Sequence, residues 1–292
     1  MDILAQVLNG LGIGSIYALV ALGYSMVYGI VQLINFAHGD IIMVGAYVTY
    51  VGLVMAGVPL WAAVLISILF CGLAGVLIEK LAYSRLLKMG APRISLLITA
   101  IGVSIFLQNL SQLLFSSSAK SMPAMFPNTM LELGTLQISS NTLLNIGTSV
   151  VMMIALQLLV NKTKMGKAMR ATSEDAGAAK LMGINTNSTI AITFGVGSAL
   201  AAVGAVLYCN TFHQITPYMG GMLGLKAFVA VLVVIGSIPG AMLGGYILGV
   251  AESLTTAAGG SQITDAVVFG ILILVLLIKP AGLLGKNVRE KV

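Results

Sequence analysis

The sequence predicts an all-α fold: a polytopic transmembrane helical bundle of about eight or nine spans, with a short helix on its cytoplasmic side. The first observation is composition, because 58% of the 292 residues are hydrophobic and only 8% are charged. The second is that the few charges lie between long uncharged runs. A soluble domain is about 25% charged, since polar side chains must cover its surface. The composition therefore excludes a soluble enzyme, a nucleic-acid-binding protein and a disordered chain.

Six runs contain no Asp, Glu, Lys or Arg: 3–39, 41–78, 94–119, 133–161, 181–225 and 227–251. A helix rises about 1.5 Å per residue, so roughly 20 residues cross a hydrocarbon core of ~30 Å. Spans are expected at about 4–30, 39–56, 60–79, 94–115, 142–160, 188–208, 222–236, 240–257 and 262–278. Residues 271–278 (ILILVLLI) are apolar on every side, which favours a lipid-embedded helix over an alternating β-strand.

Basic residues set the expected topology. Thirteen of the fifteen lie in three blocks, at 80–93, 162–180 and 279–291, and the positive-inside rule makes these blocks cytoplasmic. Nine spans then place the N-terminus outside. A re-entrant break over 31–40 would instead give eight spans and an N-terminus inside, and the sequence leaves both open. Because the chain starts with Met1-Asp2 and its first base is Lys80, we expect the first span to be no cleavable signal peptide.

Glycine spacing predicts closely packed helices. The chain has 34 glycines, and small residues recur four positions apart at Gly10-Gly14, Gly195-Ala199, Gly240-Gly244 and Gly245-Gly249. Small residues let helix backbones approach where lipid provides little hydrophobic drive for association.

Polar residues at membrane depth are costly and are therefore the first candidates for function. One cluster lies between two apolar runs and comprises Gln32, Asn35, His38, Gly39 and Asp40. Two interpretations remain open, with Gly39 at the break in both. Either Asp40 caps a helix that starts near Ile41, or the segment is a polar break that lines a pathway. Glu252 lies deep in another apolar run. Either it faces the bundle interior or a water-filled path, or it is a satisfied buried acid near the outer end of its helix.

No catalytic or metal site is expected. The two histidines are isolated, no HExxH, CxxC or GxSxG is present, and Cys71 and Cys209 stand alone inside or beside apolar runs. The sequence also lacks the GxxxxGK[ST] phosphate loop. Any ATP hydrolysis that drives this protein must therefore take place in a separate chain.

The second basic block is longer than a turn needs. Residues 164–185 (KMGKAMRATSEDAGAAKLMGIN) favour helix, and we expect one at about 173–184. Thr172 or Ser173 would cap it, Glu174 and Asp175 would occupy its first turn, and Gly183 would end it. Two interpretations are open, a docking helix for a soluble partner or an ordinary interfacial loop.

Three stretches resemble one family. Residues 174–179 (EDAGAA) with Gly183-Ile184 after them look like the EAA-type cytoplasmic loop of ABC importer permeases. Residues 14–47 and 224–252 are similar to the opening and C-terminal signatures of branched-chain amino-acid (LivH-type) permeases. The chain departs from the family at Val233-Val234, where a Gly-Gly pair is common. It also has Asp175 where the wider EAA pattern has alanine, although the branched-chain subgroup commonly carries that acid.

The resemblance implies that residues 1–292 form a single permease domain with a coupling loop at about 161–186. The residues expected to couple this loop to an ATPase are Arg170, Glu174, Asp175, Ala176, Ala179 and Gly183. Glu174 and Asp175 would either cap the helix or meet basic residues of the ATPase. The expected partners are a second permease subunit, two ABC ATPase subunits, an extracytoplasmic substrate-binding protein and the lipid bilayer, with no nucleic acid.

The resemblance further implies a multi-pass subunit of a bacterial or archaeal cytoplasmic (inner) membrane that moves branched-chain amino acids by alternating access. The subunit would be no enzyme and would bind no cofactor, because ATP and Mg²⁺ are used by the partner ATPases. Two alternatives remain open at this stage. Related permeases carry urea or short-chain amides, and an ion-coupled secondary transporter would use Asp40 or Glu252 as its ion site.

Overall fold

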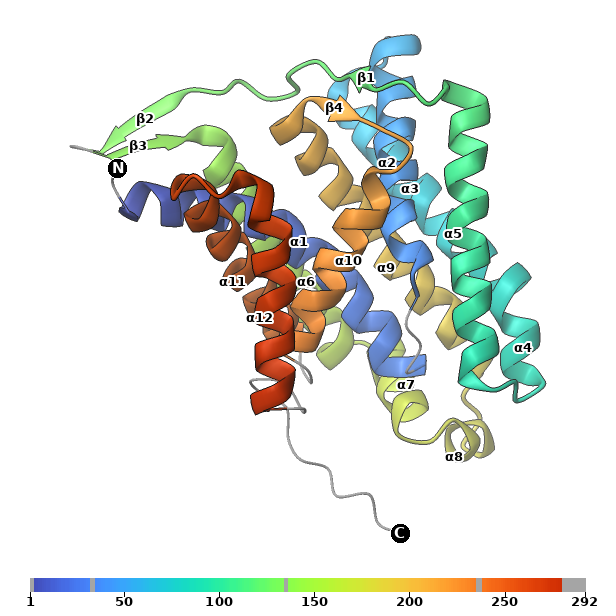
Figure 1. Cartoon of the computed structure of the whole chain (residues 1–292). Helices are drawn as coiled ribbons and strands as arrows, with labels where there is room; N and C mark the ends of the chain where they lie inside the picture. Colours follow the sequence, from blue (N-terminus) through green and yellow to red (C-terminus); the bar gives the residue numbers. More distant parts are fainter. Residues whose placement is uncertain (1–2, 32–34, 134–135, 235–237, 280–292) are drawn as a thin grey trace.

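The computed structural model describes residues 3–31, 35–133, 136–234 and 238–279, and this part of the chain is a helical bundle (Figure 1). Short strands and a long connection lie at one end of the bundle, while α7 (Lys164–Glu174) and α8 (Ala176–Leu181) lie at the opposite end. The predicted all-α membrane bundle is confirmed.

Each expected span corresponds to a helix. The bounds are α1 (Ile3–Val31), α2 (Ala37–Tyr50) continued by η1 (Val51–Met55), α3 (Leu60–Ile78) continued by η2 (Glu79–Tyr83) and α4 (Ser84–Lys88), α5 (Arg93–Phe115), α6 (Ser140–Lys162), α9 (Thr186–Phe212), α10 (Met219–Val233), α11 (Ile238–Ala257), and η3 (Ser261–Ile263) with α12 (Thr264–Ile278). The third helix runs nine residues past its expected end at residue 79, because the ladder continues through the π-helical turn η2 into α4.

Seven of the described helices are long and apolar enough to cross a membrane, by length and composition. The helix α10 is apolar but has only 15 residues, and the 20-residue α11 is not among the seven. Residues 32–34, within the segment where a re-entrant break was considered, lie outside the described residues, so the choice between eight and nine spans stays open.

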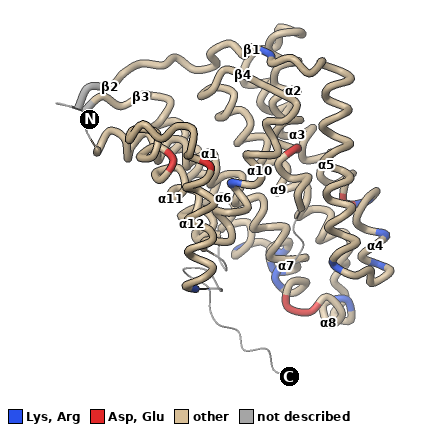
Figure 2. The backbone as a smooth tube through the Cα atoms, in the orientation of Figure 1, with Lys and Arg blue, Asp and Glu red and all other residues tan. Residues whose placement is uncertain are grey.

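Basic residues gather at one end of the bundle (Figure 2), over α4, α7 and α8. The strand β1 (Lys120–Ser121), which carries another base, lies at the opposite end. Of the third basic block, only Lys279 is among the described residues. The first two blocks therefore share one side, as the positive-inside argument predicted.

The helices α1 and α11 pack antiparallel with their backbones almost in contact. A Cβ atom on Gly249 would collide with the backbone of Gly14, and one on Gly245 would lie 2.5 Å from the backbone nitrogen of Ala18. The Ser253 hydroxyl adds a hydrogen bond to the Gln6 carbonyl oxygen, at 2.7 Å. The close packing predicted from glycine spacing is confirmed here.

Two further glycines from these small-residue pairs, Gly195 and Gly244, lie where two helices cross. A Cβ on Gly195 of α9 would lie 2.9 Å from the Val76 side chain and 3.2 Å from the Gly72 carbonyl oxygen of α3, and one on Gly244 would collide with Ala230 of α10. The helices α1, α2 and α9 are half-buried or more, whereas α3, α5, α6 and α12 expose most of their surface. This inner and outer division positions the polar residues considered below.

The connection between α5 and α6 contains short strands. The strand β1 pairs antiparallel with β4 (Gln214–Ile215), and β2 (Met130–Leu133) forms a hairpin with β3 (Leu136–Ser139). The Asn210 carboxamide at the end of α9 accepts hydrogen bonds from the Met125 and Phe126 amides, both at 3.1 Å. These contacts fix the connection across the end of the bundle opposite to α7 and α8.

Candidate functional site

The polar segment before α2 differs from its expected geometry. The helix begins at Ala37, so Gly39 lies inside its first turn and not at a break. Gly39 is needed there for packing, because a Cβ would collide with the Gly220 carbonyl oxygen and lie 2.9 Å from the Gly224 Cα of α10. Asp40 is no helix cap, since the N-cap residue is Phe36 and no side chain caps the helix. The interpretation of Asp40 as a cap is therefore wrong, and the Asp40 carboxylate is available for other contacts.

Asn35 and His38 are both buried and lie beside tyrosines. The Tyr83 hydroxyl donates to Asn35 Oδ1 at 2.9 Å, and the His38 ring meets the Tyr24 ring edge-on at a centroid distance of 4.6 Å. Asn35 Nδ2, His38 Nε2 and Tyr24 Oη are buried without a hydrogen-bond partner in the described part of the chain. Buried polar atoms are almost always paired, so this concentration marks a functional candidate. Gln32, grouped with these residues from the sequence, lies outside the described residues.

Asp40 is fully buried and reaches across to α5. Gln108 Nε2 donates to Asp40 Oδ1 at 3.0 Å and also lies 3.3 Å from Ser104 Oγ, one turn away on the same helix. Asp40 Oδ2 is buried without a partner among the described residues. This pairing could not be predicted from the sequence, because Asp40 and Gln108 are 68 positions apart. The polar residues of α5 were its only sign.

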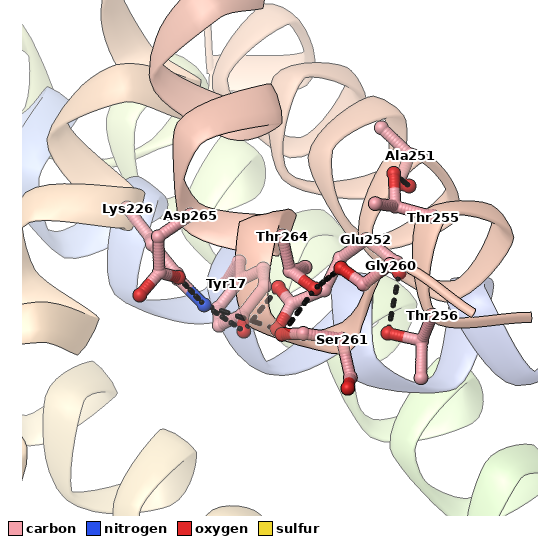
Figure 3. Close-up of polar contacts among 10 residues, drawn as sticks. All are labelled: Tyr17, Lys226, Ala251, Glu252, Thr255, Thr256, Gly260, Ser261, Thr264 and Asp265. Atoms are coloured by element: carbon pink, nitrogen blue, oxygen red, sulfur yellow. Dashed lines mark hydrogen bonds and ion pairs between the residues drawn. The ribbon is translucent and has the colours of Figure 1, made fainter. Parts of the chain in front are cut away.

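Glu252 belongs to a buried ionic cluster that joins four helices (Figure 3). The Lys226 ammonium of α10 lies 3.0 Å from Glu252 Oε1 of α11 and 2.9 Å from Asp265 Oδ1 of α12. The Tyr17 hydroxyl of α1 donates to Glu252 Oε2 at 2.7 Å, and the Lys226 Nζ lies 5.5 Å from the centroid of the Tyr17 ring. Glu252 therefore has hydrogen-bond and ionic partners, as the interpretation of a satisfied acid expects, and its place on a pathway stays a prediction.

The sequence did not predict that these four residues meet. Lys226 was one of two bases outside the three blocks, and it is the only charged residue between 181 and 251. A lone base within an apolar run is costly without a partner, so that position was the available signal. Glu252 and Asp265 were two candidate partners in the sequence. Lys226 meets both because α10 packs against α11 and α12.

The coupling segment consists of two helices where one was expected. The first, α7 (Lys164–Glu174), is capped by the Thr163 hydroxyl, which accepts from the Gly166 amide at 3.0 Å. Arg170 Nη1 donates to the Val160 carbonyl oxygen at 2.9 Å and to Asn161 Oδ1 at 3.0 Å. Arg170 therefore fixes α7 against the end of α6.

The second helix, α8 (Ala176–Leu181), is capped by Asp175, whose Oδ1 accepts from the Gly177 and Ala178 amides at 2.8 and 2.9 Å. The predicted caps Thr172 and Ser173 are wrong, because both hydroxyls donate to carbonyl oxygens inside α7. Glu174 ends α7 and is not in the first turn of the docking helix. The chain turns at Glu174-Asp175 because an aspartate in extended conformation starts the new helix.

The outer surface of α8 is open. Ala176 is exposed, Ala179 is buried against the bundle, and Leu181 and Met182 expose 90% and 83% of their surface. Gly183 ends the segment with φ +83°, a left-handed conformation that a glycine adopts without strain. The segment thus presents a short, capped helix with an apolar tip at the basic end of the bundle.

Within the described residues, no three His, Cys, Asp or Glu side chains gather as a metal site requires. Cys71 and Cys209 are both free and buried.

The comparison with known proteins assigns the family. Residues 6–277 match the model of the family described as branched-chain amino acid transport system / permease component. The chain belongs to this permease family. The permease is 45% identical over 302 residues to BraD of Pseudomonas aeruginosa, a high-affinity branched-chain amino acid transport system permease protein, covering 99% of this chain and 98% of BraD.

Two other relatives extend the comparison. The permease is 43% identical to LivH of Escherichia coli over 303 residues, covering 99% of this chain and 97% of LivH. It is also 31% identical over 287 residues to a probable branched-chain amino acid transport permease protein of Methanocaldococcus jannaschii, covering 93% of this chain and 89% of that protein. The permease is thus a multi-pass membrane protein of a transport family, and its helices match that class.

Proposed function

We propose that this chain is the membrane-spanning permease subunit of an ABC importer that moves branched-chain amino acids inward across a bacterial or archaeal cytoplasmic membrane. The observation that carries the proposal is the full-length similarity, at 43–45% identity, to BraD and LivH. The capped helix α8, exposed at the basic end of the bundle, supports it independently of the comparison.

Docking of an ATPase would use the α7–α8 segment. The exposed side chains of Leu181 and Met182 suit an apolar groove on a soluble partner, since an amphipathic helix buries such residues on binding. The Asp175 cap and the Gly183 turn hold α8 in shape, while Ala176 and Glu174 lie on the accessible surface. In this proposal ATP and Mg²⁺ bind only to the ATPase.

Movement of the docked ATPases would reach the spans through α7. That helix contacts α6, α9 and α1, and Arg170 fastens it to the end of α6. The tight packing of α1 on α11 would carry the displacement across the bundle as a rigid pair. Alternating access then follows if ATP binding draws two such permeases together on the cytoplasmic side and hydrolysis releases them.

The complete transporter would contain a second permease subunit, two ATPase subunits and an extracytoplasmic protein that delivers the amino acid. Specificity would rest largely with that protein, because the described spans carry few polar groups that could recognise a substrate. The long connection over β1–β3 lies opposite to α7 and α8, so in this proposal delivery would take place on its side.

Reconstitution tests the proposal. The chain is co-expressed with the second permease and ATPases of its own genome, purified, and placed in proteoliposomes with the binding protein. We expect ATP-dependent uptake of leucine, isoleucine or valine that excess urea does not reduce and that an uncoupler leaves intact. Stable isolation without any ATPase, together with uptake that collapses with the uncoupler while ATP remains, would overturn the proposal in favour of an ion-coupled carrier.

A further inference from the structure

The helix α5 carries polar side chains at membrane depth, at the edge of the face that packs on α2. Gln108 lies fifteen residues beyond Arg93, or about 22 Å along the helix at ~1.5 Å per residue. Ser104 and Gln108 are both half-buried, one turn apart. The main contacts of α5 within the chain are with α2 and η2, so most of its surface has no neighbour in this subunit (Figure 1).

The Asp40 carboxylate fixes the orientation of the Gln108 carboxamide. Nε2 donates to Asp40 Oδ1 at 3.0 Å and lies 3.3 Å from Ser104 Oγ, so both amide hydrogens are used. A carboxylate accepts and never donates when ionised, so the nitrogen and not the oxygen of Gln108 must face Asp40. The Gln108 carbonyl oxygen is left without a partner among the described residues, on the side of the amide away from Asp40.

Asp40 has no compensating cation among the described residues. Both ion pairs found in the described residues involve Lys226, and neither includes Asp40. Its Oδ2 is buried without a hydrogen-bond partner there. A buried carboxylate at membrane depth with no cation is costly, and such residues usually mark a solute or ion path. Lipid offers neither a proton donor nor a positive charge to the adjacent α5 face.

We propose that Ser104 and Gln108, oriented by Asp40, form a solute-contact site on the translocation path, where Gln108 Oε1 accepts a hydrogen bond from the ammonium group of the transported amino acid. The site rests on the proposed function and deepens it, because it names the solute group that the permease contacts. The neutral Gln108 carbonyl oxygen, with the Asp40 carboxylate behind it, would attract the ammonium group of an amino acid. It would bind that group weakly enough for the amino acid to leave again. The second permease would close the other side of the path.

Cysteine accessibility tests the location of this face. Cys71 and Cys209 are buried, so a single engineered cysteine is the reactive thiol of this subunit. Ser104→Cys changes one atom, and Gln108→Cys removes the amide. Phe106→Cys is the lipid-facing control, because Phe106 lies at the same depth on α5 and is 64% exposed. The probe is a cationic, water-soluble methanethiosulfonate applied to the complete transporter, with the partner subunits made cysteine-free.

We expect the cysteines at 104 and 108 to react at least about tenfold faster than the cysteine at 106, because only a hydrated thiol ionises to the reactive thiolate. Leucine with its binding protein should slow both reactions. If the cysteines at 104 and 108 are as slow as the one at 106 under every nucleotide condition, α5 faces lipid here and the inference is wrong. Fast reaction that leucine leaves unchanged would overturn the contact with the solute.

Transport per ATP gives the second readout. Gln108→Leu should lower leucine uptake per ATP hydrolysed about tenfold, as expected for the loss of one charge-assisted hydrogen bond. The control Thr99→Val, also on α5, removes only a hydroxyl bonded to the Ser95 carbonyl oxygen and should leave the ratio unchanged. An unchanged ratio in Gln108→Leu would contradict the site. Failure of the wild-type transporter to import leucine would instead contradict the proposed function, whatever the labelling shows.

Discussion

The Lys226 ammonium lies 3.0 Å from the Glu252 carboxylate, inside the bundle and between two helices that carry no other charge. The side chains of Lys226 and Glu252 are only 10% and 18% exposed. Tyr17 of α1 and Asp265 of α12 complete the hydrogen bonds, so one base holds four helices in register (Figure 3). Such a cluster specifies which helix faces meet, because each alternative packing leaves a charge without its partner.

Removing Lys226 should destabilise the protein strongly. We expect Lys226→Met to lower the free energy of unfolding by about 3–5 kcal/mol, since Glu252 remains buried without its cation. The double variant Lys226→Met/Glu252→Gln should recover part of this loss. Thermal unfolding in detergent measures both. Asp265→Asn is the control, because the Asp265 side chain is 52% exposed and its pairing contributes less. A double variant no more stable than Lys226→Met would contradict the pairing.

Enlarging Gly249 should separate α1 from α11. A Cβ at this position collides with the backbone of Gly14, so Gly249→Leu should cost at least about 1–3 kcal/mol through overpacking. Gly270→Leu in α12 is the matched control, because a Cβ there meets nothing within 4 Å. Melting temperature and the yield of monodisperse protein report the difference. Equal stability of the two variants would show that this helix contact is looser than described.

Removing the cap of α8 should weaken coupling to the ATPase. Asp175→Ala leaves the Gly177 and Ala178 amides without their acceptor, at a cost of about 1 kcal/mol to this helix. Asp175→Asn keeps an acceptor oxygen and should behave like the wild type. The measurement is the ATPase rate stimulated by loaded binding protein. If Asp175→Asn is as impaired as Asp175→Ala, the carboxylate acts through its charge on the ATPase and not as a cap.

Filling the turn at Gly183 should impair docking without affecting insertion. Gly183→Trp adds bulk beside the exposed tip and forces a left-handed conformation that costs about 1–2 kcal/mol for an L-residue. Coupled ATPase activity should fall while the amount of protein in the membrane stays the same. Gly183→Asn is the control, because asparagine tolerates this conformation better. Normal activity in Gly183→Trp would count against a docking role for α8.

The positions of the helices could be predicted well because lipid imposes a simple rule on sequence. Backbone groups in hydrocarbon must bond within the helix, so long apolar runs predict spans without knowledge of their neighbours. The predicted helix boundaries were wrong where side-chain hydrogen bonds and close helix packing decide the first residue of a helix. Asp175, not Thr172 or Ser173, starts α8, and α2 starts two residues before Gly39. Which residue caps a helix depends on the backbone conformation at that position. Several neighbouring polar residues are equally good candidates in the sequence, so the sequence does not decide between them.

The sequence by itself determined the membrane class, the basic end of the bundle, the helix faces that pack through glycine and the segment that becomes α7–α8. Each of these depends on local composition and spacing. Only the tertiary structure decided which polar groups meet. Lys226 and Glu252 are separated by 26 positions and Asp40 and Gln108 by 68, so helix packing alone brings them together. Charges in a membrane must find partners, but the fold determines which partners lie within reach, and it left Asp40 without a cation among the described residues.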